Sequence, residues 1–545
     1  MQNNKPLFDM NRIARLRAMP TGKMPSKALL IGSLLLSTAV QATTLRIDNE
    51  GEPGSLDPQQ SNNLWDSRIQ RELFDRLVDY SAEGELVPGL AERWEVSDDG
   101  LTWTFHLRDA QWSDGQPITA DDAVYSLRRL LSPAMANQNA NLYYPIVNAR
   151  AINTGKLAPE QLGVKELDAH TLQIRLEQPT PWFLQTMAMS EAAPLPRHYI
   201  EANTQWINPG ETVVSGPFRL AEWASQSKVV LQKNPRFYAA DDVAIDRAVF
   251  YPIDNSGAAL RRFRAGDLDI SYSSVPSTRF DWVREHLGKS LRSGPLNAEY
   301  FYMFNLRHDS PLADKRVREA LNLAVRRNVI TGQILGMGQQ PSYWLVPHAT
   351  AGDVRSRMAF ADMPMEERMA RAQKLMQQAG YGPDHPLSLT LRYNTSEDHK
   401  KIAIAIAAMW KPLGVQVKMV NSEAAVHYAS IQQGDFQVAR YGMVATVNDP
   451  FDFLGSYASG GSAARSSGYH SDRYDELIEQ GNRTLEPQQR AEVLGQAQQL
   501  LLDDYALLPI YDYVTHHLVS PQVRGWQSNA MDIHPLRWVS LAPES

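Results

Sequence analysis

The chain has 545 residues, of which 43% are hydrophobic and 21% are charged, and it contains 33 prolines and 32 glycines. This composition is globular and excludes a disordered or fibrous protein, and the length suggests two to four domains. The formal net charge of −7 gives no basic surplus of the kind that nucleic-acid binding requires, so we expect no nucleic-acid partner.

The first 42 residues have the pattern of a secretory signal peptide. Arginines and lysines precede an apolar run at positions 28–40, and small residues stand at Val40 and Ala42. These 13 apolar residues, at about 1.5 Å each, cannot cross a hydrocarbon core ~30 Å thick, which argues against a membrane anchor. The sequence therefore predicts removal of residues 1–42, a mature chain that starts at Thr43, and a periplasmic location.

Cysteine is absent from the sequence. Its absence excludes a bacterial lipid anchor on cysteine, so we expect no lipoprotein. It also excludes disulfides, thiolate catalysis and cysteine-based metal sites.

From Thr44 onward, stretches typical of strands and of helices alternate. The Asp-Gly pairs at 99–100 and 114–115 stand between alternating apolar residues. They could be acidic catalytic pairs, but this setting is first of all that of a hairpin turn. A helix is expected to open near Thr119, and Pro311 and Asp314 signal another that runs to about Ala324.

One unit in the second half of the chain predicts the fold class. Residues 387–393 alternate with period two, residues 396–413 have a helical pattern, and residues 415–419 alternate again. A strand, a helix and a second strand in this order indicate a βαβ unit, which favours a parallel sheet and an α/β fold.

Recognisable catalytic or metal-binding motifs are missing. The adjacent pair His516-His517 would point to opposite faces of a strand, which is poor ligand geometry. The stretches Gly336-Met337-Gly338 and Ser459 to Gly468 are predicted to be turns rather than binding loops. We expect no enzyme, no cofactor and no metal site, although an enzyme with scattered catalytic residues stays an open alternative.

A long stretch carries a family resemblance: residues 88–122 read PGLAERWEVSDDGLTWTFHLRDAQWSDGQPITADD. This stretch closely resembles the signature of the family 5 extracellular solute-binding proteins, which include receptors for peptides and for nickel. Further matches follow in family order over essentially the whole mature chain. They include residues 56–58, 216–218, 263–269, 393–401 and 507–511, and they are most similar to the oligopeptide-binding subgroup.

The resemblance implies an α/β fold of the two-lobed periplasmic binding protein type II with an additional inserted domain (three-domain, cluster C). The implied domains are a signal peptide (1–42), lobe I (43–75, 188–296 and 506–545), the inserted domain (76–187) and lobe II (297–505). The implied function is capture of a peptide or peptide-like ligand between the lobes and its delivery to an inner-membrane ABC permease by a monomeric receptor. The alternatives are a receptor for a non-peptide solute, such as a modified sugar or metal chelate, and a ligand sensor for a membrane partner.

The resemblance also assigns ligand-binding residues, with departures from the family pattern. Peptide receptors hold the ligand's α-ammonium with a buried aspartate, and Thr446 stands at that position here. Met443 and Ala424 align with tryptophans, Ile431 aligns with an arginine, and Arg440 and His399 agree with the oligopeptide pattern. The expected ligand-binding residues are Thr446, Met443, Ala445, Asn448, Arg440, His399 and Asn62, the last of which aligns with an acidic residue.

Each of the three main candidates has a structural alternative. Thr446 could be a polar core residue, Arg440 could pair with a carboxylate between the lobes, and His399 could lie on the surface at a helix N-terminus. A threonine hydroxyl supplies no negative charge to balance a buried ammonium. We therefore expect that the ligand needs no free α-ammonium, or that another carboxylate, with Asp449 nearest in sequence, has taken over.

Overall fold

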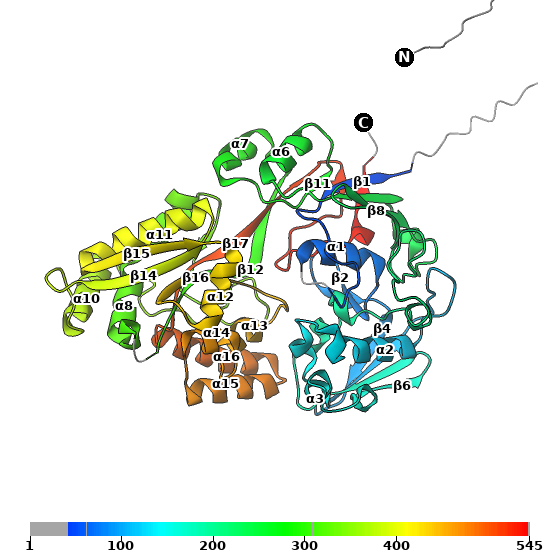
Figure 1. Cartoon of the computed structure of the whole chain (residues 1–545), viewed down its shortest axis with the longest axis horizontal. Coiled ribbons are helices and arrows are strands. Elements are labelled where there is room, and N and C mark those ends of the chain that lie inside the picture. The colour runs from blue at the N-terminus through cyan, green and yellow to red at the C-terminus, as the bar shows by residue number, and fades with distance from the viewer. Residues whose placement is uncertain (1–41, 61–62, 308–309, 543–545) are drawn as a thin grey trace, which may run out of the picture. The chain divides into compact units, whose positions relative to one another are not determined.

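The largest sheet in the structure has eleven strands drawn from almost the full length of the described chain. The computed structural model describes residues 42–60, 63–307 and 310–542. In spatial order (Figure 1) the strands are β15 (Val415–Ser422), β14 (Leu387–Asn394), β16 (Val438–Val444), β12 (Leu291–Phe304), β17 (Leu507–Val519), β11 (Ile270–Ser271), β1 (Thr44–Asp48), β10 (Arg247–Tyr251), β9 (Lys228–Lys233) and β8 (Phe218–Ala224), and β13 (Gln340–Pro341) pairs with β17.

Two long neighbouring strands, β12 and β17, form the centre of this sheet. They pair antiparallel from Leu291 opposite Leu518 to Met303 opposite Leu507. The second half of β12, from Tyr300 to Phe304, is fully buried, because elements pack on both faces of the sheet there. In Figure 1 the two strands run between the elements at the left of the picture and those at the right.

The βαβ unit predicted from the sequence is confirmed. Strands β14 and β15 pair in parallel, from Leu387 opposite Val415 to Asn394 opposite Ser422. Helix α11 (Glu397–Trp410) and a short 3₁₀ turn (Lys411–Leu413) connect them, and the buried side chains of α11 recur at helical spacing. The predicted helix before Ala324 is also present as α8 (Lys315–Ala324), which the side chain of Asp314 caps through the backbone N–H of Arg316.

A separate four-stranded sheet lies in the N-terminal third of the chain. Its order is β4 (Ala91–Val96), β5 (Thr102–Leu107), β7 (Thr171–Arg175) and β6 (Val164–Asp168). The predicted turn between β4 and β5 is confirmed by the bond from Gly100 N to Ser97 O, 2.8 Å, and Gly100 has φ +70°. Helix α2 (Ala120–Leu130) opens at Thr119, as expected, with a capping box to Asp122.

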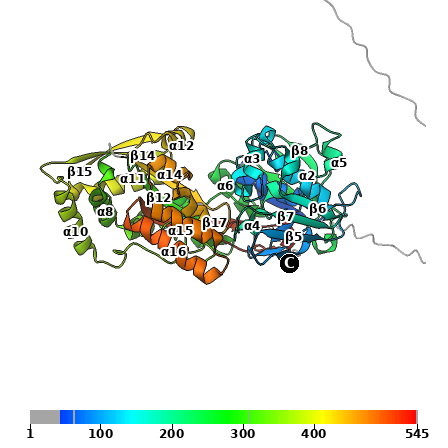
Figure 2. The same ribbon diagram turned by 90° about the horizontal axis from the view of Figure 1, so that it is seen from below.

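The described residues form further helices in addition to α2, α8 and α11. They are α1 (Leu64–Leu73), α3 (Ala149–Asn153), α4 (Phe183–Thr186), α5 (Arg197–Ile200), α6 (Ser256–Arg264), α7 (Phe280–His286), α9 (Arg327–Val329), α10 (Met365–Gln378), α12 (Ala424–Gln433), α13 (Pro450–Leu454), α14 (Ser462–Ser467), α15 (Asp472–Arg483) and α16 (Pro487–Asp503). Helices α15 and α16 lie side by side (Figure 2).

The expectation of a surface turn from Ser459 to Gly468 is wrong, because α14 forms there with four buried residues.

Three groups of apolar side chains form the main hydrophobic cores. One draws on residues between 77 and 192, one combines residues 45–74, 193–272 and 519–539, and the third, in two adjoining clusters, draws on residues 300–511.

The predicted domain boundaries stay a prediction. The predicted signal peptide lies outside the described residues except for Ala42. Within the described ranges, no helix combines the length and apolar character that crossing a membrane requires.

The βαβ unit gives a test of the fold at Gly414, which closes the turn between α11 and β15. Its φ is +77°, and an added Cβ would stand 2.3 Å from the carbonyl carbon of Gly382. Gly380 has a similar φ of +86° but no atom within 4 Å of an added Cβ. Gly380→Ala should cost about 1 kcal/mol, from the left-handed backbone alone. Gly414→Ala should cost about 1–3 kcal/mol more, because the backbone must also shift. Thermal unfolding of both variants checks this, and equal midpoints would contradict the packing at Gly414.

Candidate functional site

The predicted ligand-binding residues surround β16 and the segment that follows it. Arg440, Gly442 and Val444 alternate with Tyr441 and Met443 along the strand, so the two sets face opposite sides of the sheet. Met443 packs against the core on its side, where its sulfur accepts a hydrogen bond from Ser456 Oγ at 3.7 Å. The structure therefore separates Met443 from Arg440.

The segment after β16 lies at the wall of a cavity of about 400 Å³. Thr446 is exposed there, so it is not a polar core residue. Its predicted neighbour Ala445 lines the same wall, and the backbone N–H of Ala445 donates to Asn297 O at 2.8 Å. Most of the rest of the wall comes from α1, from residues 188–191 and from residues 531–536.

The carboxylates nearest to Thr446 in sequence are already engaged. Both oxygens of the buried Asp449 accept from the guanidinium of Arg490, each at 2.7 Å, and Asp449 also caps α13. Asp452 Oδ2 accepts from the backbone N–H groups of Thr446 and Val447. Asp449 also does not line the cavity at Thr446, which argues against it as the relocated partner of a ligand ammonium.

Asn448, another predicted ligand residue, holds the segment in place. Its side-chain oxygen accepts from Asn297 Nδ2 at 3.0 Å and from the backbone N–H of Ala351 at 2.9 Å. Its backbone forms two hydrogen bonds with the side-chain amide of Gln185, which lies on α4, 263 residues away in the sequence. The contacts of Asn448 position Thr446 and connect the segment to α4.

Burial shifts the pKa values of the ionisable side chains that α1 contributes to the cavity wall. It raises the pKa of Glu72 from 4.5 to about 8, against the opposing effects of a hydrogen bond from Leu536 N and of the charge on Arg76. Burial and the charge of Arg76 lower the pKa of Arg71 to about 10. At neutral pH this wall therefore carries arginine charge, and Glu72 is largely protonated.

Arg440 is a buried cation whose described partners are all uncharged. Its guanidinium donates to Tyr428 Oη at 2.9 Å and to Tyr513 Oη, and it lies 4.8 Å from the centre of the Tyr300 ring. Among the residues that the structure describes, no carboxylate lies within ion-pair distance of it, so the alternative of a structural ion pair is wrong. Burial opposes its charge, but the phenol groups of Tyr513 and Tyr300 outweigh burial and raise the pKa of Arg440.

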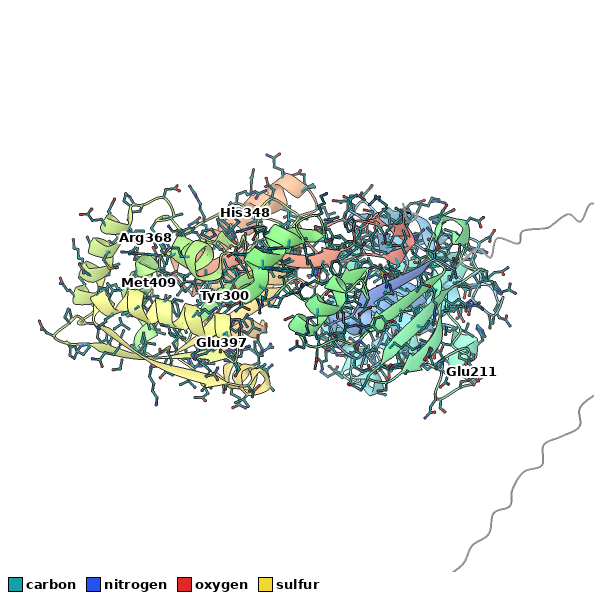
Figure 3. All side chains as sticks on the ribbon, turned by 90° about the horizontal axis from the view of Figure 1, so that it is seen from above. Glu211, Tyr300, His348, Arg368, Glu397 and Met409 are labelled. Carbon is teal, nitrogen blue, oxygen red and sulfur yellow. The ribbon has the colours of Figure 1, made fainter. Side chains whose placement is uncertain are left out.

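His399 lies beside the same tyrosine. It belongs to the first turn of α11, which begins at Glu397, and its Nδ1 lies 3.4 Å from Tyr300 Oη. Figure 3 labels Tyr300 and Glu397. It is half-buried rather than fully on the surface. Burial, together with the charge of Arg440, lowers the pKa of His399 to about 3, so the imidazole is neutral at pH 7.

The structure thus brings the predicted residues together in two places. Thr446 and Ala445 lie at the cavity, while Arg440 and His399 lie around Tyr300. Asn62 lies outside the described residues. Sequence reasoning missed the tyrosines around Arg440, because they come from β12, α12 and β17 and no local spacing connects them.

Comparison with known proteins decides the family. Residues 85–465 match the bacterial extracellular solute-binding proteins, family 5 Middle. The chain belongs to this family. It is therefore a solute-binding protein and not an enzyme, as the sequence predicts.

Individual relatives agree with this assignment over most of the chain. The periplasmic murein peptide-binding protein MppA of Escherichia coli is 37% identical over 515 residues, which cover 92% of this chain and 95% of MppA. The E. coli protein named "Probable deoxycholate-binding periplasmic protein YgiS" is 36% identical, over 88% of this chain and 90% of YgiS. The structure of Haemophilus influenzae OppA in complex with RPPGFSPFR matches with a TM-score of 0.77 and 33% identity, covering 92% of this chain and 99% of OppA. The two-lobed, three-domain α/β fold expected from the sequence is confirmed.

The Asp449–Arg490 pair gives a test of how the segment after β16 is held. Asp449→Asn keeps an N-cap for α13 but leaves the arginine charge buried without a partner, which should cost about 3–5 kcal/mol of stability. The matched control is Arg473→Gln, which breaks an exposed ion pair to Glu476 and should cost at most about 1 kcal/mol. Denaturant unfolding measures both. An Asp449→Asn cost no larger than that of the control would contradict the role given to this pair.

The raised pKa of Glu72 predicts a pH dependence of stability. A carboxyl group whose pKa is higher in the folded state than in the unfolded state stabilises the fold while it is protonated, and this contribution is lost as the pH rises from about 4.5 to about 8. Glu72→Gln stays neutral and keeps an oxygen for the N–H of Leu536. The unfolding midpoint of the wild type should therefore fall relative to that of Glu72→Gln between pH 5 and pH 8.5. If the unfolding midpoints of the wild type and Glu72→Gln change in parallel with pH, burial does not raise the pKa of Glu72.

Proposed function

We propose that this chain is the periplasmic receptor of an ABC importer that captures a peptide or peptide-like solute and delivers it to an inner-membrane permease. Family membership and the names of MppA and OppA support peptide capture. The absence of cysteine supports a receptor without a lipid anchor. We further propose that it works as a monomer and that ligand binding closes two lobes while no bond is made or broken.

One observation carries the proposal about the ligand: Thr446 is exposed at the cavity wall, and the carboxyl groups described around it are engaged or uncharged. Asp449 is paired with Arg490, and burial keeps Glu72 largely protonated at neutral pH. Asp532 is bonded to His517 and His534, and Glu191 accepts from Asn139 Nδ2. A cation that leaves water needs a charged partner, because its lost hydration is otherwise uncompensated. The ligand should therefore need no free α-ammonium at this position.

Arg440 supports a second requirement, which is a carboxylate at another part of the ligand. The guanidinium already has its hydrogen-bonding partners in place, but its charge has no counterion among the described residues. A ligand carboxylate at this position would supply that charge, and the neutral His399 beside Tyr300 adds a polar group without charge repulsion. We propose Arg440 and His399 as the carboxylate anchor.

A second candidate ligand is an apolar organic acid. Leu64 and Val444 line the cavity, and their side chains are 63% and 57% exposed, which is unusual for large apolar groups in a wall. An apolar solute would cover both of them. The relative YgiS, at 36% identity, is named as a probable deoxycholate-binding protein, which supports this candidate.

The proposal can be tested with matched ligands. Calorimetry should compare one peptide with a free amino terminus, the same peptide N-acetylated, and deoxycholate. Because Thr446 offers no charge, acetylation should change the Kd by less than about tenfold, whereas loss of a buried charge partner would change it by roughly two to four decades. If acetylation abolishes tight binding, the ligand requires an ammonium and this part of the proposal falls.

A pair of variants at Thr446 supplies the control. Thr446→Asp adds a carboxylate and should favour the free-amine peptide over the acetylated one by at least about tenfold, as expected for a hydrogen bond between charged groups. Thr446→Asn has the same size without the charge and should leave the ratio near that of the wild type. An equal response of the two variants would show that Thr446 does not face the ligand's amino end.

A further inference from the structure

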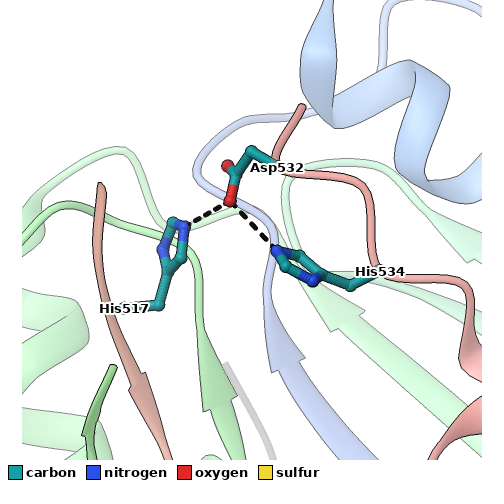
Figure 4. Close-up of side chains that lie close together, drawn as sticks. All are labelled: His517, Asp532 and His534. Carbon is teal, nitrogen blue, oxygen red and sulfur yellow. Dashed lines mark hydrogen bonds and ion pairs between the residues drawn. The ribbon is translucent and has the colours of Figure 1, made fainter. Parts of the chain in front are cut away.

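We propose that His517, Asp532 and His534 form a binding site for one divalent transition-metal ion of the zinc class. Three potential ligand atoms meet here: the Nε2 atoms of the two imidazoles and Oδ1 of the aspartate (Figure 4). The proposal does not rest on the peptide function, since it concerns a different group of side chains.

The geometry is close to that of a metal site. Oδ1 of Asp532 lies 2.7 Å from His517 Nε2 and 3.0 Å from His534 Nε2, and all three atoms lie within 4.8 Å of one another. A tetrahedral zinc ion with bonds of about 2.0–2.1 Å holds its ligand atoms roughly 3.3 Å apart. The two nitrogen-to-oxygen distances therefore need to lengthen by less than an ångström to admit the ion, which would replace the two hydrogen bonds. The two imidazole nitrogens, no more than 4.8 Å apart, would settle at the same separation.

The ligand chemistry selects the class of ion. Two imidazole nitrogens and one carboxylate oxygen suit zinc, copper and nickel, whereas calcium and magnesium prefer oxygen ligands throughout. All three side chains are largely shielded from solvent, with 5%, 15% and 2% exposed for His517, Asp532 and His534. An ion bound among them would be protected from competing water on the protein side.

The surrounding residues fix the position of each ligand. The His534 ring stacks on Trp526 at 4.1 Å, and Tyr272 lies against both imidazoles. The loop that carries Asp532 and His534 is clamped by Asn529, whose side chain donates to Ile533 O at 2.7 Å and accepts from Ile533 N at 3.2 Å. A rigid shell of this kind is what holds metal ligands in one orientation.

Metal binding would move one proton within each imidazole. Asp532 Oδ1 now accepts from both Nε2 atoms, so each Nε2 that binds the ion passes its proton to Nδ1. Nδ1 of His517 is buried with no hydrogen-bond partner among the described atoms, and Asn529 Nδ2, a donor, lies 3.5 Å from His534 Nδ1. The bonds to the ion must outweigh the cost of these unpaired N–H groups. Arg68, a cation close to the cluster, lies over the Tyr272 ring and pairs with Glu50 at 2.8 Å, which offsets its repulsion of an ion.

The ion would have an open side. Asp532 and His534 line the same cavity of about 400 Å³ as Thr446, whereas His517 lies behind them. Three protein ligands with an open fourth position leave room for water or for a donor atom of a bound solute. The adjacent His516 takes no part, because it faces the other side of β17, where its Nδ1 lies 2.8 Å from Ser293 Oγ.

The test is zinc binding by the full, untagged protein after treatment with EDTA. Titration against a chromogenic chelator should show one Zn²⁺ per chain with a Kd at or below about 1 µM, and removal of any one ligand should weaken it by about 100-fold or more. His534→Phe keeps a ring between Trp526 and Tyr272 without a ligand atom, and Asp532→Asn keeps the hydrogen-bond acceptor without the charge. The control His516→Gln changes the neighbouring histidine and should leave the Kd within about twofold.

Cobalt substitution keeps the test informative if a variant folds poorly. Co²⁺ bound to the wild type should give the visible absorption of a four-coordinate nitrogen and oxygen site, and this spectrum should be absent from Asp532→Asn and present in His516→Gln. Failure of the wild type to take up zinc at 100 µM overturns the proposal, as does an unchanged zinc affinity in both His534→Phe and Asp532→Asn. Neither result bears on peptide binding, which the matched-peptide calorimetry measures separately.

Discussion

The antiparallel pairing of β12 with β17 is the constraint on which the rest of the structure depends. These strands stand at the middle of the eleven-stranded sheet, with β16, β14 and β15 on one side and β11, β1 and β10 on the other. Because β12 also pairs with β16, its register places Tyr302 opposite Arg440 and Ala298 opposite Val444. A shift of one residue would turn every side chain of β16 to the other face, so the same pairing decides which residues can meet a ligand.

Burial of charge decides the chemistry that this framework can perform. Three buried groups near the candidate site differ in how their charge is accommodated: Asp449 is paired with Arg490, Glu72 is kept largely protonated at neutral pH, and Arg440 stays charged among tyrosines. Of these three, Arg440 is the one whose charge has no counterion among the described residues. A receptor gains selectivity from such a group, because an uncharged solute that binds beside the guanidinium leaves its buried charge without a counterion. This charge pattern is the basis of our proposal that the solute is anionic and needs no ammonium group.

Asn448 is a predicted ligand-binding residue whose polar groups also position the segment after β16. Its amide oxygen is used by Asn297 and Ala351, and its backbone bonds to Gln185 on α4. These bonds place the exposed Thr446 at the cavity wall, next to α1 and the 531–536 segment. The family resemblance predicts that this segment contacts the ligand, and the structure adds the contacts by which Asn448 holds the segment in place.

The sequence by itself determined the local elements and the family. Alternation at 387–393 and 415–419 with a helical pattern between them predicted the parallel βαβ unit, because side-chain periodicity follows directly from backbone geometry. The Asp-Gly turn at 99–100 and the opening of α2 at Thr119 were also readable, since these signals act over a few residues. The same local reading failed at 459–468, where the burial of Ala463 and Ala464 against the core favours helix α14 over a glycine-rich turn.

Only the tertiary structure decided which distant side chains meet. Arg440 lies among tyrosines from three elements, and His517 meets Asp532 and His534 across a loop rather than its sequence neighbour His516. No spacing rule connects such residues, because their contacts depend on strand register and on long-range pairing through β12 and β17. Burial likewise decided that Glu72 is largely protonated and that Asp449 is unavailable to a ligand, since desolvation depends on how the whole chain packs around a group rather than on its sequence neighbours.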